Sequence, residues 1–201
     1  MTATAQRRRP TPSGWAVPRL AAIDRRSHAV SVAAVALLLA GCSGGPTEVT
    51  GVSLEVPAGW ERVDTPSDPQ VLATATWRGG RAEASSLQLV VGCGPGSVAD
   101  LASAAVTRDR PPLTVTDAEV DTDVEVTGAE AAIGLDLTLG AGRTDDASTV
   151  AVRGVYAEVG GALVLVELST PVRDADDPVV EATLSGITLD APTLTEACDG
   201  G

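Results

Sequence analysis

Nucleophilic and metal chemistry need side chains that this sequence supplies sparingly. The single histidine, His28, lies within the first 41 residues, and the chain contains no lysine. The remaining 160 residues therefore cannot assemble a Ser-His-Asp or Cys-His system, a lysine base, a Schiff base or a histidine-ligated zinc site. Only carboxylates and Tyr156 are left as acid–base groups. We predict that the chain is not an enzyme and has no catalytic residue.

The carboxylates leave two alternatives open. Paired carboxylates hydrolyse glycosides when they are buried and face each other in a deep cleft, and replacing a single acid such as Asp136 or Glu167 would test for such activity. The aromatic residues that commonly line sugar sites make up only 2% of the sequence, which argues against a glycan hydrolase. The second alternative is a Ca²⁺-responsive module, because five acidic residues alternate along one segment and would share one face of a strand. These residues are Asp117, Glu119, Asp121, Asp123 and Glu125.

That acidic row lacks the mid-loop glycine and the terminal bidentate glutamate of an EF-hand. A solvated strand face explains it more economically, so we predict no metal site and no cofactor. The two tryptophans beyond residue 41, Trp60 and Trp77, are expected to pack in the core, with ligand stacking as the alternative.

The first of the three cysteines ends a targeting signal. Arginine-rich residues 1–28 precede a 12-residue apolar run, 29–40, which is too short for a membrane-spanning helix of about 20 residues. The run ends in Leu39-Ala40-Gly41-Cys42, which resembles the bacterial lipobox. That resemblance implies cleavage before Cys42 and transfer of diacylglycerol to its thiol, with palmitate as a typical acyl chain.

We therefore expect a signal peptide at 1–41, a lipidated Cys42 with a polar tether to residue 50, and one extracytoplasmic domain at 51–201. The predicted location is the outer face of the cell membrane, held there by the lipid. General secretion is the favoured export route, and Arg25-Arg26 leaves the twin-arginine route open. The true start is also open, since Val17 and Leu20 are candidate non-Met starts.

The other two cysteines, Cys93 and Cys198, form an even pair in an oxidising compartment. We predict a disulfide between them that pins a polar C-terminal tail, with two free thiols as the alternative. The glycines around Cys93 provide a turn that can bring it to a partner.

Charge divides sharply between the two parts of the chain. Residues 1–41 carry a formal charge of +5, whereas the remaining residues hold eight arginines and 26 acidic residues, a net charge of −18. Such a domain repels phosphate backbones, so nucleic-acid binding is excluded. Direct adhesion of the domain to anionic lipid is excluded for the same reason.

Hydrophobic periodicity predicts strands, then a helix, a long run of strands and a closing helix. Residues 163–166 are apolar on both faces and are the expected central strand. Ser97 with Asp100 is expected to cap the first helix, and Asp177 before Pro178 the second. This order predicts an α+β fold, an antiparallel sheet packed with two or so helices. The other expected strands are 52–56, 71–77, 87–91, 120–126, 133–139 and 150–156.

The opening segment 52–63, VSLEVPAGWERV, the long antiparallel middle and the closing apolar helix resemble small actinobacterial lipoproteins of the LpqN type. The resemblance covers most of residues 51–190, and its most motif-like part is Pro57-x-Gly59-Trp60. It implies a PsbP-like sandwich and a superfamily of accessory or binding proteins, so no catalytic residue carries over. The absence of Lys, Asn and Phe fits the high-GC genome of an actinobacterium. We predict a non-enzymatic binding or accessory module with an envelope protein as partner.

Overall fold

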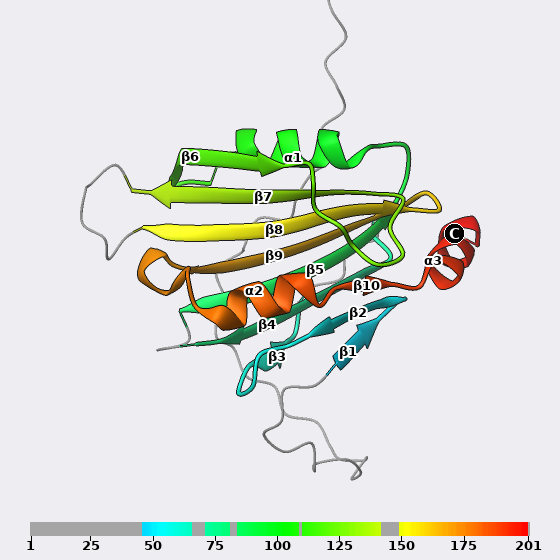
Figure 1. Ribbon diagram of the computed structural model, residues 1–201, viewed down its shortest axis with the longest axis horizontal. Helices are drawn as coiled ribbons and strands as arrows, with labels where there is room; N and C mark the ends of the chain where they lie inside the picture. Colours follow the sequence, from blue (N-terminus) through cyan, green and yellow to red (C-terminus); the bar gives the residue numbers. More distant parts are fainter. Residues whose placement is uncertain (1–45, 66–70, 81–83, 109, 142–148, 201) are drawn as a thin grey trace, which may run out of the picture. The chain divides into compact units, whose positions relative to one another are not determined.

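The computed structural model describes residues 46–65, 71–80, 84–108, 110–141 and 149–200 (Figure 1). Residues 1–41, the predicted signal peptide, and Cys42 lie outside the described residues. No helix within these ranges is long and apolar enough to cross a membrane. The elements are β1 (Pro46–Val49), β2 (Val52–Glu55), β3 (Glu61–Val63), β4 (Ala73–Gly79), β5 (Ser85–Cys93), α1 (Val98–Thr107), β6 (Thr114–Asp121), β7 (Ala131–Gly140), β8 (Val150–Val159), β9 (Ala162–Pro171), the 3₁₀ turn η3 (Val172–Asp174), α2 (Pro178–Ser185), β10 (Thr188–Leu189) and α3 (Ala191–Asp199).

Seven strands form one antiparallel sheet in the order β3-β4-β5-β9-β8-β7-β6. Strand β9 is the fourth of the seven, so the prediction that residues 163–166 form the central strand is confirmed. The other three strands form a small antiparallel sheet in the order β1-β2-β10. The architecture is the predicted α+β class.

One face of the large sheet is covered by the small sheet together with α2 and α3. Val52 and Leu54 of β2 are 0% and 1% exposed, and they pack with side chains that alternate along the large sheet. Alternation places every second residue on this face, because successive side chains of a strand point to opposite sides. The shared core includes Ala75, Trp77, Leu87, Leu89, Val91, Val155, Ala157, Val164, Val166, Leu168, Val180, Ile187 and Leu194.

Helix α1 covers part of the opposite face. Its start is fixed by the predicted capping box: the Ser97 hydroxyl accepts from the Asp100 amide at 3.2 Å, and the Asp100 carboxylate accepts from the Ser97 amide at 3.2 Å. Such a box satisfies two otherwise unpaired amides at a helix N-terminus. The buried face of the helix, Val98, Ala102 and Ala105, packs on Ile133, Leu135, Leu137, Leu139, Val152 and Tyr156.

Besides two short strands that the sequence did not predict, β3 and β10, the structure differs from the sequence prediction at three places. Residues 46–49 of the predicted tether form β1, because they pair with β2 through a tight turn in which Thr50 and Gly51 have positive φ. The strand expected at 120–126 is instead β6, which ends at Asp121. The polar C-terminal tail contains a third helix, α3, whose Leu194 is fully buried.

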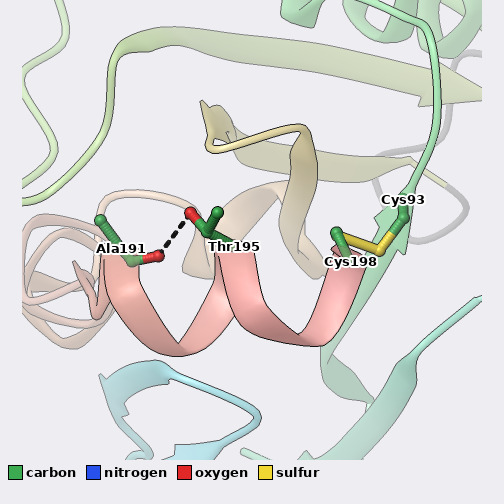
Figure 2. The surroundings of a disulfide bond; sticks show 4 residues. All are labelled: Cys93, Ala191, Thr195 and Cys198. Carbon is green, nitrogen blue, oxygen red and sulfur yellow. Dashed lines mark hydrogen bonds between the residues drawn. A yellow bond between two sulfur atoms is a disulfide. The ribbon is translucent and has the colours of Figure 1, made fainter. Parts of the chain in front are cut away.

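The predicted disulfide between Cys93 and Cys198 is present (Figure 2). It joins the end of β5 to the last turn of α3, with the two Cα atoms 5.5 Å apart. Helix α3 also contacts the hairpin turn of β1 and β2, since the Asp190 amide donates to the Gly51 carbonyl at 2.8 Å. The disulfide therefore keeps a short helix in place against the core.

We expect the double variant Cys93→Ser/Cys198→Ser to lower the free energy of unfolding. The cysteines are 105 residues apart, and for a loop of that length the chain-entropy model gives at most about 4–5 kcal/mol. Urea denaturation followed by tryptophan fluorescence measures the loss. Adding reductant should cause the same loss of unfolding free energy in the unmodified domain and should leave the unfolding free energy of the double variant unchanged. An unchanged denaturation midpoint would show that α3 is held by packing alone.

Candidate functional site

A cleft of about 300 Å³ opens on the large sheet beside α2. It exists because α2 and the small sheet do not extend over β6 and β7, which leaves that part of the face open (Figure 1). The sheet supplies its floor, the segment after β6 one wall and α2 the other. Its lining consists of Glu119, Asp121, Val124, Glu125, Gly134, Leu135, Asp136, Arg153, Gly154, Val155, Glu181, Leu184 and Ser185.

Strand register brings the charged floor together. Glu119 of β6 lies opposite Asp136 of β7, and Asp136 lies opposite Arg153 of β8. Directly opposed residues point to the same face, so these three side chains form a row across the sheet. Gly134 makes room for the wall, because a Cβ there would lie 2.9 Å from Cγ2 of Val124.

Arg153 is the basic residue of the lining, and two carboxylates hold it. Its Nε donates to Oδ1 of Asp136 at 3.0 Å and its Nη2 donates to Oδ2 at 3.3 Å. Its Nη1 lies 3.6 Å from Oε2 of Glu181 on α2. The hydrogen bond to Asp136 is the main cause that raises the pKa of Arg153. All three side chains are partly exposed, so these pairs contribute less than about 1 kcal/mol each to stability.

The cleft is strongly negative despite Arg153, since five carboxylates line it. A concave surface of one charge sign concentrates counter-ions of the opposite sign and steers charged partners toward it. Among the described residues, no group of three or more His, Cys, Asp or Glu side chains converges as a metal site requires. Within the described part of the chain, the acidic lining is therefore an extended surface and not a converging cluster.

The acidic row predicted from the sequence is divided by the fold. Asp117, Glu119 and Asp121 share one face of β6. The prediction that Asp123 and Glu125 continue this strand face is wrong, because β6 ends at Asp121, whose carboxylate accepts from the Asp123 amide at 2.9 Å. Three acids of the row, Glu119, Asp121 and Glu125, nevertheless line the cleft.

A second polar group lies on the other face of the sheet, beneath α1. The Tyr156 hydroxyl donates to Oε1 of Glu167 at 2.6 Å, and the two residues are 1% and 8% exposed. Gly154 allows this contact: it lies opposite Glu167, and a Cβ there would come within 3.0 Å of the Tyr156 ring. Burial, with the charge and hydrogen bond of Glu167, raises the pKa of Tyr156 far above its ordinary value.

Arg110 completes this buried polar group. Its Nη1 donates to the Ala105 carbonyl near the end of α1 at 2.7 Å, while its Nη2 is buried without a partner among the described residues. Burial lowers the pKa of Arg110, and the nearby charge of Glu167 opposes that effect. This buried group was not predicted from the sequence. One signal for it is the single acid, Glu167, within the apolar run of β9.

The glycan-hydrolase alternative needs two carboxylates that face each other. Asp136 and Glu167 lie on opposite faces of the sheet, as their strand partners Arg153 and Gly154 show. Glu167 is instead bound to Tyr156. Asp136 and Glu167 therefore do not form a facing pair, and the carboxylates that line the cleft with Asp136 belong to exposed residues.

The tryptophans lie away from the cleft. Trp77 is 4% exposed within the core, and the Arg62 guanidinium carbon lies 5.9 Å from the centre of its ring. Trp60 is half-buried and lies against Gly79, where any Cβ would collide with its ring. Packing accounts for both positions.

Comparison with known proteins places the fold. No family model and no curated protein matches the chain. Among solved structures, cyanobacterial PsbP from Synechocystis has a TM-score of 0.55 at 17% identity, covering 78% of this chain and 98% of that one. A protein of unknown function from Pseudomonas aeruginosa, a putative regulator, has a TM-score of 0.36 at 19% identity, covering 69% and 88%. The fold is PsbP-like.

Tyr156 is the chain's single tyrosine, so its ionisation can be followed directly by phenolate absorbance. A free tyrosine ionises near pH 10, whereas native Tyr156, whose pKa is raised, stays protonated. Above about pH 10 only the unfolded state loses this proton, so the contribution of Tyr156 to stability is constant below about pH 10 and falls as pH rises above it. We expect phenolate to appear only together with cooperative unfolding.

Glu167→Gln provides the matched comparison, because it removes the negative charge and keeps the size of the side chain. In this variant, folded as judged by circular dichroism, the Tyr156 phenolate should appear at lower pH than in the unmodified protein. Smooth ionisation of the unmodified native protein with a midpoint near 10 would contradict a buried, carboxylate-bound Tyr156.

Proposed function

We propose that this chain is a lipid-anchored accessory protein of the cell envelope, and that its acidic cleft binds a positively charged segment of an envelope protein. The cleft is the observation that carries the proposal: a 300 Å³ hollow with five carboxylates on its floor and walls. Arginine and lysine side chains are the complementary groups. Binding of this kind is fast and sensitive to salt.

The anchor is supported by the sequence. The lipobox Leu39-Ala40-Gly41-Cys42 follows an apolar run of the length found in signal peptides, and the resemblance to LpqN-type actinobacterial lipoproteins points the same way. On this proposal the domain works on the outer face of the membrane.

A binding role agrees with the chemistry of the site. The cleft contains carboxylates and Arg153 but no serine–histidine or cysteine–histidine pair, because the chain beyond residue 41 has no histidine. Glu167, the most deeply buried acid of the described residues, accepts a hydrogen bond from Tyr156 on the face of the sheet opposite the cleft. A fully satisfied buried hydrogen bond of this kind rigidifies the fold.

We expect Cys42→Ala to abolish lipid attachment, because the thiol is the acceptor. The variant should remain as uncleaved precursor or leave the membrane fraction. Fractionation of cells followed by immunoblotting measures this. Ser43→Ala serves as the control, since it changes the neighbouring residue and keeps both the Cys42 thiol and the Cys93–Cys198 disulfide. Normal cleavage and full membrane retention of Cys42→Ala would refute the anchor.

Cross-linking tests the cleft. A photoreactive amino acid at Ser185, on the cleft wall, should capture a neighbour in intact cells, whereas the same group at exposed Ala99 on α1 should not. The double variant Glu119→Gln/Asp121→Asn should abolish capture from Ser185. Glu61→Gln/Asp64→Asn removes the same charge from exposed positions outside the cleft and should leave capture unchanged. If the Glu119→Gln/Asp121→Asn variant still captures the neighbour from Ser185, the proposal that the cleft recognises positive charge is contradicted.

A further inference from the structure

The folded domain begins very close to the proposed lipid. Only three residues separate Cys42 from Pro46, the first residue of β1. Four residue steps of fully extended chain span at most about 14 Å. A domain of this size has a diameter of roughly 40 Å, from its expected radius of gyration of about 15 Å. The tether is thus short compared with the body it holds.

Strand β1 has a defined place in that body. It is an outer strand of the small sheet, and Pro46 pairs with Glu55 at the end of β2 (Figure 1). Figure 1 shows the small sheet near the β3–β4 edge of the large sheet, and its buried side chains share one core with those of β4 and β5. Pro46 therefore lies beside the chain that leads from β2 into β3.

The cleft lies toward the other edge of the molecule. Its floor is made by β6, β7 and β8, and α2 stands between it and β2, with Gly186 at the end of α2 beside Glu55. Strand β6 is five positions from β4 in the large sheet, which corresponds to about 24 Å at ~4.8 Å per strand.

We propose that the anchor orients the domain, with β1 and the β2–β3 turn toward the bilayer and the acidic cleft and β6 away from it. This inference rests on the proposed function. The cleft then receives a cationic polypeptide segment that projects well beyond the headgroups of the membrane. Exposed Glu48, Glu55 and Glu61 on the β1 side keep the domain from lying flat on an anionic surface.

The orientation can be measured on an engineered anchor that needs no cellular processing. The folded core lies entirely within residues 46–200, so residues 42–201 contain the whole described domain. Cys42 is coupled to a maleimide lipid in phosphatidylcholine vesicles, while Cys93 and Cys198 remain paired. A donor dye on a non-natural amino acid at Ala58, in the β2–β3 turn, or at Thr122, just after β6, reports energy transfer to an acceptor lipid. Both positions are exposed.

We expect transfer from Ala58 to exceed transfer from Thr122 roughly twofold, given a separation of about five strand spacings. Inserting a 12-residue Gly/Ser linker after Ser43 should remove most of the difference, because such a linker adds about 19 Å of flexible reach. Equal transfer with the native tether, or stronger transfer from Thr122, would overturn the proposed orientation. Since the anchor is engineered, that result would leave the Cys42→Ala test of the proposed function unaffected.

Discussion

The burial of strand β9 on both faces is the constraint on which the rest of the structure depends. Val164, Val166 and Leu168 are each 1% exposed on the face covered by the small sheet, α2 and α3. On the other face lie Leu163, Leu165 and Glu167. A strand with no wet face must be central, and so the hairpins on either side arrange themselves around it. Its one acid, Glu167, requires a buried partner, because an unpaired carboxylate there would cost several kcal/mol.

The elements that pack on the two faces of the large sheet cover different strands, and this difference leaves the candidate site open. Helix α1 covers β6, β7 and β8 on one face, whereas the small sheet and α2 cover mainly β4, β5, β9 and part of β8 on the other. The region of β6 and β7 that α2 leaves open becomes the acidic cleft. Its five carboxylates belong to exposed residues, so placing them there costs little folding energy. The proposed attraction for a cationic partner rests on these carboxylates.

The C-terminal helix joins the proposed anchor side of the domain to the main sheet. Helix α3 contacts the β1–β2 turn through Gly51, where Leu194 and Thr193 lie beside it, and is bonded to β5 through Cys198. The small β1–β2 hairpin would be marginal in isolation. The hairpin is stabilised because β2 pairs with β10, because its side chains pack in the core and because α3 contacts its turn. The proposed lipid therefore attaches next to an ordered part of the domain.

The sequence by itself determined the features that depend on neighbouring residues. Local patterns predicted the alternating strand at 133–139, the Ser97–Asp100 cap and the apolar run at 163–166, and the order of these elements predicted the α+β class. Once Cys42 is assigned to the lipid, Cys198 is the one cysteine left to pair with Cys93. Tertiary structure decided the rest. The strand at 46–49 has no apolar alternation and exists because β2 pairs with it, and α3 forms because Leu194 finds a buried site. The cleft joins residues of β6, β7, β8 and α2 that lie far apart in the chain. Which of these side chains meet follows from strand register and from the packing of α2 on the sheet, and no local pattern in the chain contains that.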